Sequence, residues 1–135
     1  MTLRYLLDTN TISYSIQGKF PLVRAKLDSI PADEIGLSCF TLAELVYGLA
    51  RRPGALRLRL EVEGFLKSFQ ILSWDATAAT IYGELRAEQE RKGRRVSHED
   101  LMLASHALSL GLTLVTHDRA FSFIAGLRIE DWTTH

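Results

Sequence analysis

Residues 3–10 read Leu-Arg-Tyr-Leu-Leu-Asp-Thr-Asn, so an apolar run stops abruptly at a carboxylate and two further polar side chains. The run predicts a short buried strand over residues 3–7. Asp8 then stands at the carboxyl end of that strand, where it can cap a following helix or belong to an active site. The remainder of the sequence has to decide between these two interpretations.

The composition indicates a globular protein without a strong overall electric field. Hydrophobic residues make up 47% and charged residues 24%, and the 16 basic and 16 acidic residues give a formal net charge of zero. A surface that attracts nucleic acid would therefore have to be local. The single cysteine, Cys39, cannot form an internal disulfide, which suits a reducing compartment. With no signal peptide and no apolar run of roughly 20 residues, we expect one domain, residues 1–135, in the cytoplasm and away from membranes.

Short apolar segments alternate with amphipathic segments along the chain. The predicted strands are residues 3–7, 35–38, 70–73, 112–116 and 127–129, and the predicted helices are residues 10–17, 21–29, 40–49, 55–69, 75–92 and 97–110. Ser97 and Gly111 are suitable caps for the last of these helices. This alternation predicts an α/β fold in which helices cover both faces of a parallel sheet.

Four acidic residues stand at positions where a site can form. Asp8 and Asp118 follow predicted strands, and they face one crevice if the first and fourth strands are neighbours. Glu44 interrupts an otherwise nearly uncharged helix, so it faces either solvent or a polar pocket. Asp100 follows Ser97 at the capping-box position, which also suits a purely structural role. Each acid alone therefore has a structural alternative.

Taken together, the four acids indicate a metal site. Several carboxylates in one crevice repel each other, so we expect at least one raised pKa in the metal-free protein and a cation in the working one. Mg²⁺ and Mn²⁺ prefer carboxylate and water oxygens. Such ions neutralise a phosphate and activate an attacking water, so the set predicts phosphodiester hydrolysis. Thr9, Asn10 and Thr116 are expected to orient the acids or metal-bound waters.

Four motifs, in their order and spacing, resemble a known family. They are LLDTN (residues 6–10), LAELVYG (42–48), EDLMLASHALSLG (99–111) and LVTHDRAF (114–121). Together they resemble a PIN-domain ribonuclease and, more narrowly, a VapC-type toxin of a bacterial type II toxin–antitoxin pair. The resemblance spans about residues 5–132. It implies a PIN-like three-layer α/β/α fold with a short parallel sheet in the order 3-2-1-4-5, and a Mg²⁺-dependent endoribonuclease that inhibits translation and growth.

The resemblance also implies roles for individual residues and partners. Asp8, Glu44 and Asp100 would form the acidic core, and Asp118 would supply a fourth carboxylate. Asp8 and Asp100 would hold Mg²⁺ or Mn²⁺, with Glu44 and Asp118 acting directly or through water. A homodimer and a VapB-type antitoxin, whose tail lies across the active groove, are implied as well. The ending GLRIEDW, residues 126–132, is similar to toxins that cut initiator tRNA in the anticodon stem-loop, so tRNA is the expected substrate.

Two stretches depart from the family pattern. Thr116-His117-Asp118 stands where Thr-Asn-Asp is usual, and residues 96–99, Val-Ser-His-Glu, replace a Gly-Pro-rich turn. We expect the two histidines, His98 and His117, near the crevice. They leave open a mixed histidine and carboxylate site for Mn, Fe or Zn.

A basic stretch, RKGRR at residues 91–95, precedes Asp100. Together with Arg86 it is expected to form a basic lip beside the acids, because a chain of zero net charge needs a local patch to bind phosphates. A solvated helix end is the alternative interpretation. The candidate RNA-binding residues are Arg86, Arg91, Lys92, Arg94 and Arg95.

Two other functions stay open at this point. A phosphatase with an aspartyl nucleophile would use Asp8, although such enzymes commonly have a second Asp two residues later, where this chain has Asn10. A catalytically inactive PIN-like module would bind RNA without cutting it. His106, inside an apolar helix, is interpreted as a packing residue.

Overall fold

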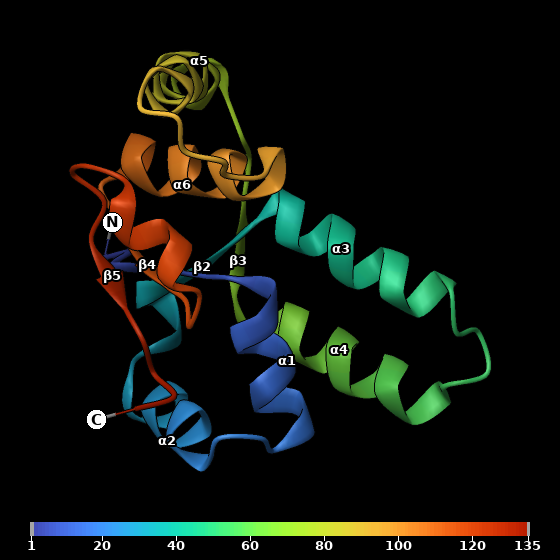
Figure 1. The fold of residues 1–135 in the computed structure, drawn as a ribbon. Helices are drawn as coiled ribbons and strands as arrows, with labels where there is room; N and C mark the ends of the chain where they lie inside the picture. The colour runs from blue at the N-terminus through green and yellow to red at the C-terminus, as the bar shows by residue number, and fades with distance from the viewer. Residues whose placement is uncertain (1, 135) are drawn as a thin grey trace.

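The computed structural model describes residues 2–134 and contains a parallel sheet between two layers of helices (Figure 1). Its strands are β1 (Tyr5–Leu7), β2 (Ile35–Ser38), β3 (Gln70–Leu72), β4 (Thr113–Val115) and β5 (Ile129–Glu130). They lie in the order β3-β2-β1-β4-β5, and all four pairings are parallel. The predicted α/β class, the three layers and the strand order are confirmed.

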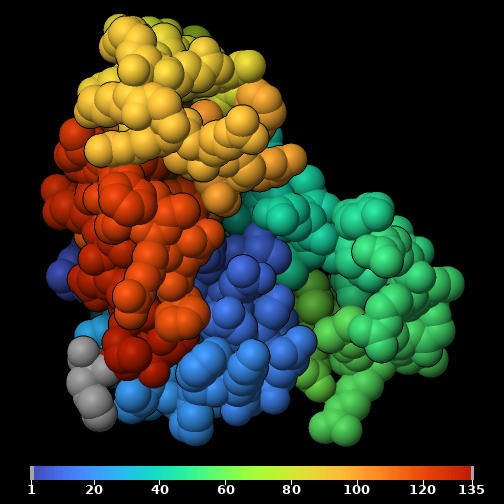
Figure 2. All heavy atoms as spheres, viewed as in Figure 1, coloured from blue at the N-terminus to red at the C-terminus, as the bar shows by residue number. Residues whose placement is uncertain are grey.

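The connections between strands are mostly helical. Within residues 2–134 they are α1 (Thr9–Gln17), α2 (Pro21–Ser29), α3 (Cys39–Ala50), α4 (Leu56–Ser68), α5 (Ala76–Arg91), α6 (His98–Leu110) and the short 3₁₀ helices η1 (Ala32–Glu34) and η2 (Arg119–Phe123). The predicted elements are all present, with bounds that shift by one or two residues, and only the 3₁₀ helices were not predicted. None of the helices in this part of the chain is both long and apolar enough to cross a membrane. In Figures 1 and 2, α3 and α4 form a hairpin that projects from the side of the sheet.

The side chains of β1 enter both helical layers. Tyr5 and Leu7 belong to the apolar cluster that α1, α2, α3 and α4 cover, whereas Leu6 belongs to the cluster under α5, α6 and η2. Successive side chains of a strand point to opposite faces, so a central strand covered on both sides has to be apolar throughout. This requirement explains the uninterrupted apolar run before Asp8.

The register of β1 fixes the edge at which the polar side chains emerge. Leu7 is opposite Leu37 of β2 on one side and opposite Val115 of β4 on the other. Asp8 and Thr116, the next residues of β1 and β4, therefore leave the sheet together at its carboxyl edge. Because β2 and β4 lie on opposite sides of β1, this edge is the switch point where α/β sheets form a crevice.

His106 of α6 is buried, which confirms its interpretation as a packing residue. Its Nδ1 lies 2.9 Å from the Ser38 hydroxyl and its Nε2 lies 3.1 Å from the backbone oxygen of Ser73. Burial lowers the pKa of His106 below the ordinary value of 6.5. A neutral imidazole thus joins α6 to the ends of β2 and β3.

The lowered pKa of His106 leads us to expect that the protein loses stability in acid. Below pH 6.5 an unfolded His106 binds a proton that the folded, buried imidazole does not bind. The unfolded state then holds more protons, so the free energy of unfolding rises with pH through this range. We expect His106→Gln to flatten that rise, measured by urea unfolding between about pH 5 and pH 7.5. His98→Gln, at an exposed histidine, is the control, and an unchanged pH dependence in His106→Gln would contradict the account.

Candidate active site

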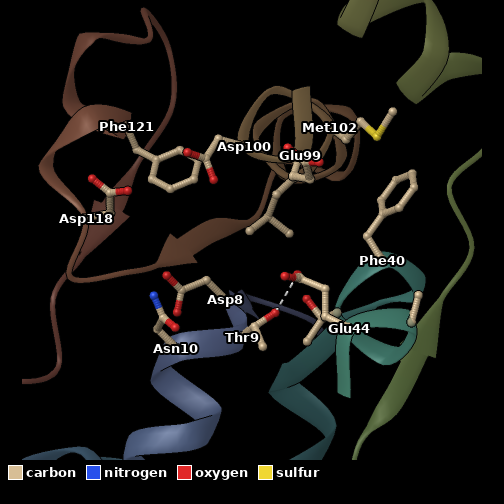
Figure 3. Close-up of a pocket in the computed structure, with 13 residues that line it drawn as sticks. Asp8, Thr9, Asn10, Phe40, Glu44, Glu99, Asp100, Met102, Asp118 and Phe121 are labelled. Carbon is tan, nitrogen blue, oxygen red and sulfur yellow. Dashed lines mark hydrogen bonds between the residues drawn. The ribbon is translucent and has the colours of Figure 1, made fainter. Parts of the chain in front are cut away.

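A pocket of about 240 Å³ opens at the carboxyl edge of the sheet, between α1, α3, α6 and η2 (Figure 3). Its acidic lining residues are Asp8, Glu44, Glu99, Asp100 and Asp118. None of its lining residues, among the described residues 2–134, is a lysine, arginine or histidine. The structure therefore brings the four acids of the sequence prediction to one place, and their catalytic roles stay a prediction.

Asp8 both caps a helix and lines the pocket. Its side chain is 7% exposed, and its Oδ1 accepts a 2.8 Å hydrogen bond from the backbone N–H of Thr11 at the start of α1. Its own backbone N–H donates to the Val115 oxygen of β4 at 3.1 Å. The capping role and the site role are thus compatible, because the cap fixes the carboxylate in the orientation that faces the pocket.

Glu44 reaches the pocket from α3. The Thr9 hydroxyl of α1 donates a 2.7 Å hydrogen bond to its Oε1, drawn as a dashed line in Figure 3. This bond orients the exposed Glu44 side chain and joins α1 to α3. Asn10 lines the same pocket beside Thr9.

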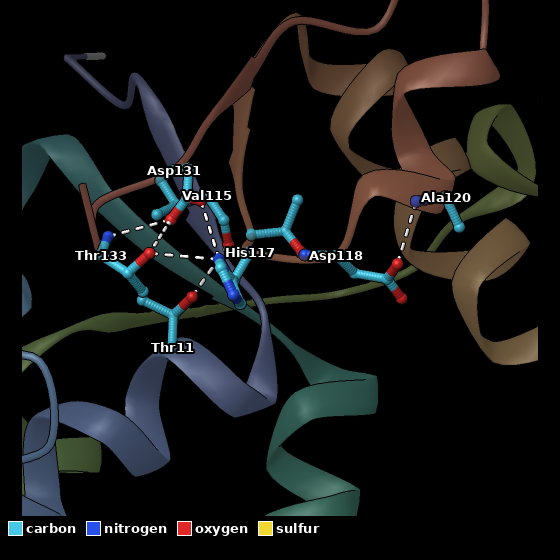
Figure 4. Close-up of polar contacts among 8 residues, drawn as sticks. Thr11, Val115, His117, Asp118, Ala120, Asp131 and Thr133 are labelled. Carbon is cyan, nitrogen blue, oxygen red and sulfur yellow. Dashed lines mark hydrogen bonds and ion pairs between the residues drawn. The ribbon is translucent and has the colours of Figure 1, made fainter. Parts of the chain in front are cut away.

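Asp118 is held by the turn that follows β4. Its Oδ1 accepts from the backbone N–H of Ala120 at 2.9 Å and so caps η2 (Figure 4). The hydroxyl of buried Thr116 accepts from the backbone N–H of Asp118 at 3.0 Å. Thr116 does not line the pocket, so its contact is with the turn that carries Asp118.

Asp100 is half-buried on the first turn of α6, and its pKa is raised. Burial is the largest cause, and the negative charges of Asp118, Asp8 and Glu99 add to it. A hydrogen bond with Ser97 acts in the opposite direction. The expected raised pKa is confirmed, although burial contributes more to it than crowding does.

The sequence did not predict two polar residues of this pocket. Glu99 precedes Asp100 and lines the pocket beside it, but an acid in a first helical turn is too common to mark a site. Thr41 of α3 is 1% exposed, and its Oγ1 has no hydrogen-bond partner among residues 2–134. An unpaired buried hydroxyl in the wall was not detectable from sequence.

His98 and His117, which were expected near the crevice, are sequence neighbours of pocket-lining residues, but neither lines the pocket. The Nδ1 atom of His98 lies 2.9 Å from the Tyr82 hydroxyl, and that of His117 lies 2.8 Å from Asp131. Figure 4 shows His117 and Asp118 pointing in opposite directions, as successive residues of an extended segment do. A mixed histidine and carboxylate site therefore has no support from this geometry.

The pocket suits a hard divalent cation. Among residues 2–134 no three or more His, Cys, Asp or Glu side chains form a ready-made metal cluster. Mg²⁺ does not need one, because it is typically bound through one or two carboxylates and keeps several waters. The purely acidic charge of the lining and the unpaired Thr41 hydroxyl are what a hydrated cation would satisfy.

The residues of the predicted basic lip lie in the last turns of α5 and in the segment between α5 and α6. Arg86 pairs with Glu90 at 3.3 Å and Lys92 pairs with Glu88 at 2.9 Å, both within one turn on the α5 side. None of the five candidate RNA-binding residues lines the acidic pocket. Their binding of RNA stays a prediction.

Comparison with known proteins agrees with this fold. The PIN domain model matches residues 5–127. The tRNA(fMet)-specific endonuclease VapC of Shigella flexneri is 39% identical over 132 residues, which is 97% of this chain and 99% of the relative. This chain belongs to the PIN-domain family.

Solved structures give the same result. The DNA-bound VapBC of Salmonella typhimurium matches with a TM-score of 0.89 at 40% identity, over 96% of this chain and 98% of that chain. VapBC2 of Rickettsia felis, bound to a DNA fragment from its promoter, matches with a TM-score of 0.87 at 32% identity, over 95% and 98% of the two chains. The three-layer fold is therefore shared along nearly the whole length of these chains.

The raised pKa of Asp100 predicts that the metal-free site is destabilising. A folded carboxyl with a raised pKa binds more protons than the unfolded one, so the free energy of unfolding falls as the pH rises above 3.8 through the folded pKa. We expect Asp100→Asn to raise the melting temperature of the metal-free protein at neutral pH. Asp33→Asn, at an exposed acid on η1, is the control, and a calorimetric scan without a gain specific to Asp100→Asn would refute the claim.

Proposed function

We propose that this chain is the toxin of a type II toxin–antitoxin pair, a metal-dependent endoribonuclease that cleaves RNA and so inhibits translation and growth. The observation that carries the proposal is the convergence of Asp8, Glu44, Asp100 and Asp118 on one pocket without a basic side chain. Relatives that match over nearly the whole chain are named endonuclease or ribonuclease VapC, which supports the same activity.

We infer that the ion is Mg²⁺, with Mn²⁺ as a substitute. Asp8 and Asp100 would bind it, and Glu44 and Asp118 would contribute directly or through water. When bound, such an ion neutralises the phosphodiester and activates an attacking water.

The chain's own residues prepare the site for this chemistry. The bond from Thr9 occupies one oxygen of Glu44, and we propose that the other oxygen accepts a proton from the attacking water. A cation binds the charged form of the Asp100 carboxyl, so the raised pKa of Asp100 makes cation binding weaken as the pH falls toward that pKa. Phe40 and Phe121 form apolar parts of the wall and exclude bulk water there.

The proposed substrate is initiator tRNA, cut in the anticodon stem-loop. Two relatives at 39% and 40% identity are named for tRNA(fMet). The ending GLRIEDW supports the same subgroup.

The proposed partner is a VapB-type antitoxin whose tail lies across the active pocket. Solved neighbours are VapBC complexes from three organisms, which supports such a pairing. An antitoxin arginine can occupy the place of the metal, because a guanidinium binds carboxylates through two parallel hydrogen bonds. We also propose a homodimer, as the family resemblance implies.

The alternatives have less support. A phosphatase with Asp8 as nucleophile is not favoured, because the relatives are nucleases and Asn10 occupies the usual place of the second Asp. An inactive RNA-binding module would not need its four site acids, which this chain retains.

The direct test uses Asp8→Asn, which keeps a good helix cap at α1 and removes the charge from the pocket. We expect it to reduce cleavage of total tRNA at least about 100-fold. EDTA should stop the wild-type reaction, and Mg²⁺ or Mn²⁺ should restore it. Sequencing of the new RNA ends locates the cut.

The matched control is Asp131→Asn, at a carboxylate beside His117 and outside the acidic pocket. It should cut at the wild-type rate. Cleavage by Asp8→Asn at that same rate, or cleavage that survives EDTA, would exclude the site assignment. Binding of tRNA without any cutting by the wild type would favour the inactive module.

A further inference from the structure

A second pocket, of about 220 Å³, lies where α5 leads into α6. Arg86, Arg94, Arg95 and His98 line it, and among the described residues 2–134 the only acid in its lining is Glu90. We call it the basic pocket. Its charge is opposite in sign to that of the acidic pocket, so it suits an anion that the acids alone would repel.

The two pockets lie on either side of the first turn of α6. His98 and Leu101 line the basic pocket, whereas Glu99 and Asp100 line the acidic one. Residues three apart share a face of a helix, so the same turn presents a different face to each pocket. An extended ligand that passes the start of α6 can therefore contact both.

The basic pocket contains a buried polar group without a partner. Gln89 of α5 lines it and is 2% exposed, and its Oε1 accepts no hydrogen bond among residues 2–134. A buried amide oxygen without a donor is costly, so its retention points to a ligand that supplies one. The ligand should thus carry a hydroxyl or another donor in addition to negative charge.

The arginines differ in what they already bind. Arg86 is engaged by Glu90 and by the Tyr82 hydroxyl, at 3.3 and 3.4 Å. Arg94 donates through Nη1 to the Phe123 backbone oxygen at 2.8 Å, which orients its guanidinium and leaves further N–H groups. The side chain of Arg95 forms no hydrogen bond or ion pair with the rest of the described chain, residues 2–134. Arg95, supported by Arg94, is the available cation.

We propose that the basic pocket binds a phosphate of the RNA strand whose scissile linkage lies in the acidic pocket. Arg94 and Arg95 would donate to the phosphate oxygens, and Gln89 would accept from the neighbouring ribose hydroxyl. The inference rests on the proposed ribonuclease function. It favours RNA over DNA, because only RNA carries the 2′-hydroxyl. It also provides strand affinity that an acidic site cannot provide by itself.

The test compares Arg95→Ala with Lys67→Ala. Both variants remove one positive charge from an exposed side chain, but Arg95 lines the basic pocket, whereas Lys67 is on α4 and does not. We expect Arg95→Ala to raise the KM for tRNA cleavage about tenfold with little change in kcat, and to lower the salt slope of KM by about one. Lys67→Ala should change the KM much less. Equal effects of the two variants would overturn the proposal.

A scan of single neutral linkages identifies the phosphate. Methylphosphonate is placed at successive positions of an anticodon stem-loop RNA, and we expect one position beside the cut to raise the wild-type KM. A neutral linkage at that position should leave the KM of Arg95→Ala unchanged, whereas neutral linkages at other positions should still change it. A 2′-deoxy sugar at the same nucleotide should weaken wild type and leave Gln89→Leu unaffected. If every neutral linkage changed the KM of Arg95→Ala as much as it changed the KM of wild type, the assignment would be contradicted.

Binding in EDTA separates this inference from the proposed function. Fluorescence anisotropy of the same RNA needs no cleavage, so a chain that cuts nothing would refute the nuclease proposal and still report on the basic pocket. Weaker RNA binding by Arg95→Ala than by Lys67→Ala would support the basic-pocket proposal. Unchanged RNA binding together with a weakened antitoxin complex would assign the pocket to an acidic protein segment and overturn the proposal.

Discussion

The parallel pairing of β1 with β4 is the constraint on which the rest of the structure depends. Leu7 lies opposite Val115, and the N–H of Asp8 donates to the Val115 oxygen at 3.1 Å. This register ends both strands at the same edge, so Asp8 and Asp118 reach one pocket although they are far apart in sequence. The helix α3, which follows β2, then adds Glu44, and α6 adds Asp100.

Two acids of the site have a structural role as well as a place in the pocket. Asp8 caps α1 and Asp118 caps η2, so hydrogen bonds that a helix needs anyway also fix the carboxylates. Within the described residues no basic side chain in the pocket compensates the gathered negative charge. The raised pKa of Asp100 shows that its charged form is destabilised there. Such a cost is typical of sites whose stability is completed by a ligand. The basic pocket across the first turn of α6 gives the polyanion a second point of attachment.

Much of this fold was predictable because local signals agreed with the global pattern. The apolar run before Asp8 and the caps Ser97 and Gly111 each indicated an element that the structure contains. The direction of individual side chains was harder to predict from the sequence. His117 stands next to a site acid in sequence but points away from the pocket, whereas Glu99 looked like an ordinary first-turn acid and lines it. Only tertiary packing decides which side of a turn faces a crevice.

The central claim is that a divalent cation completes the acidic pocket. The most direct measurement is anomalous diffraction at the manganese edge from crystals grown with Mn²⁺. The account predicts a peak in the pocket between Asp8 and Asp100, with water oxygens as its remaining ligands. A pocket without a peak under these conditions, or a peak beside His117 and Asp131 instead, would contradict it.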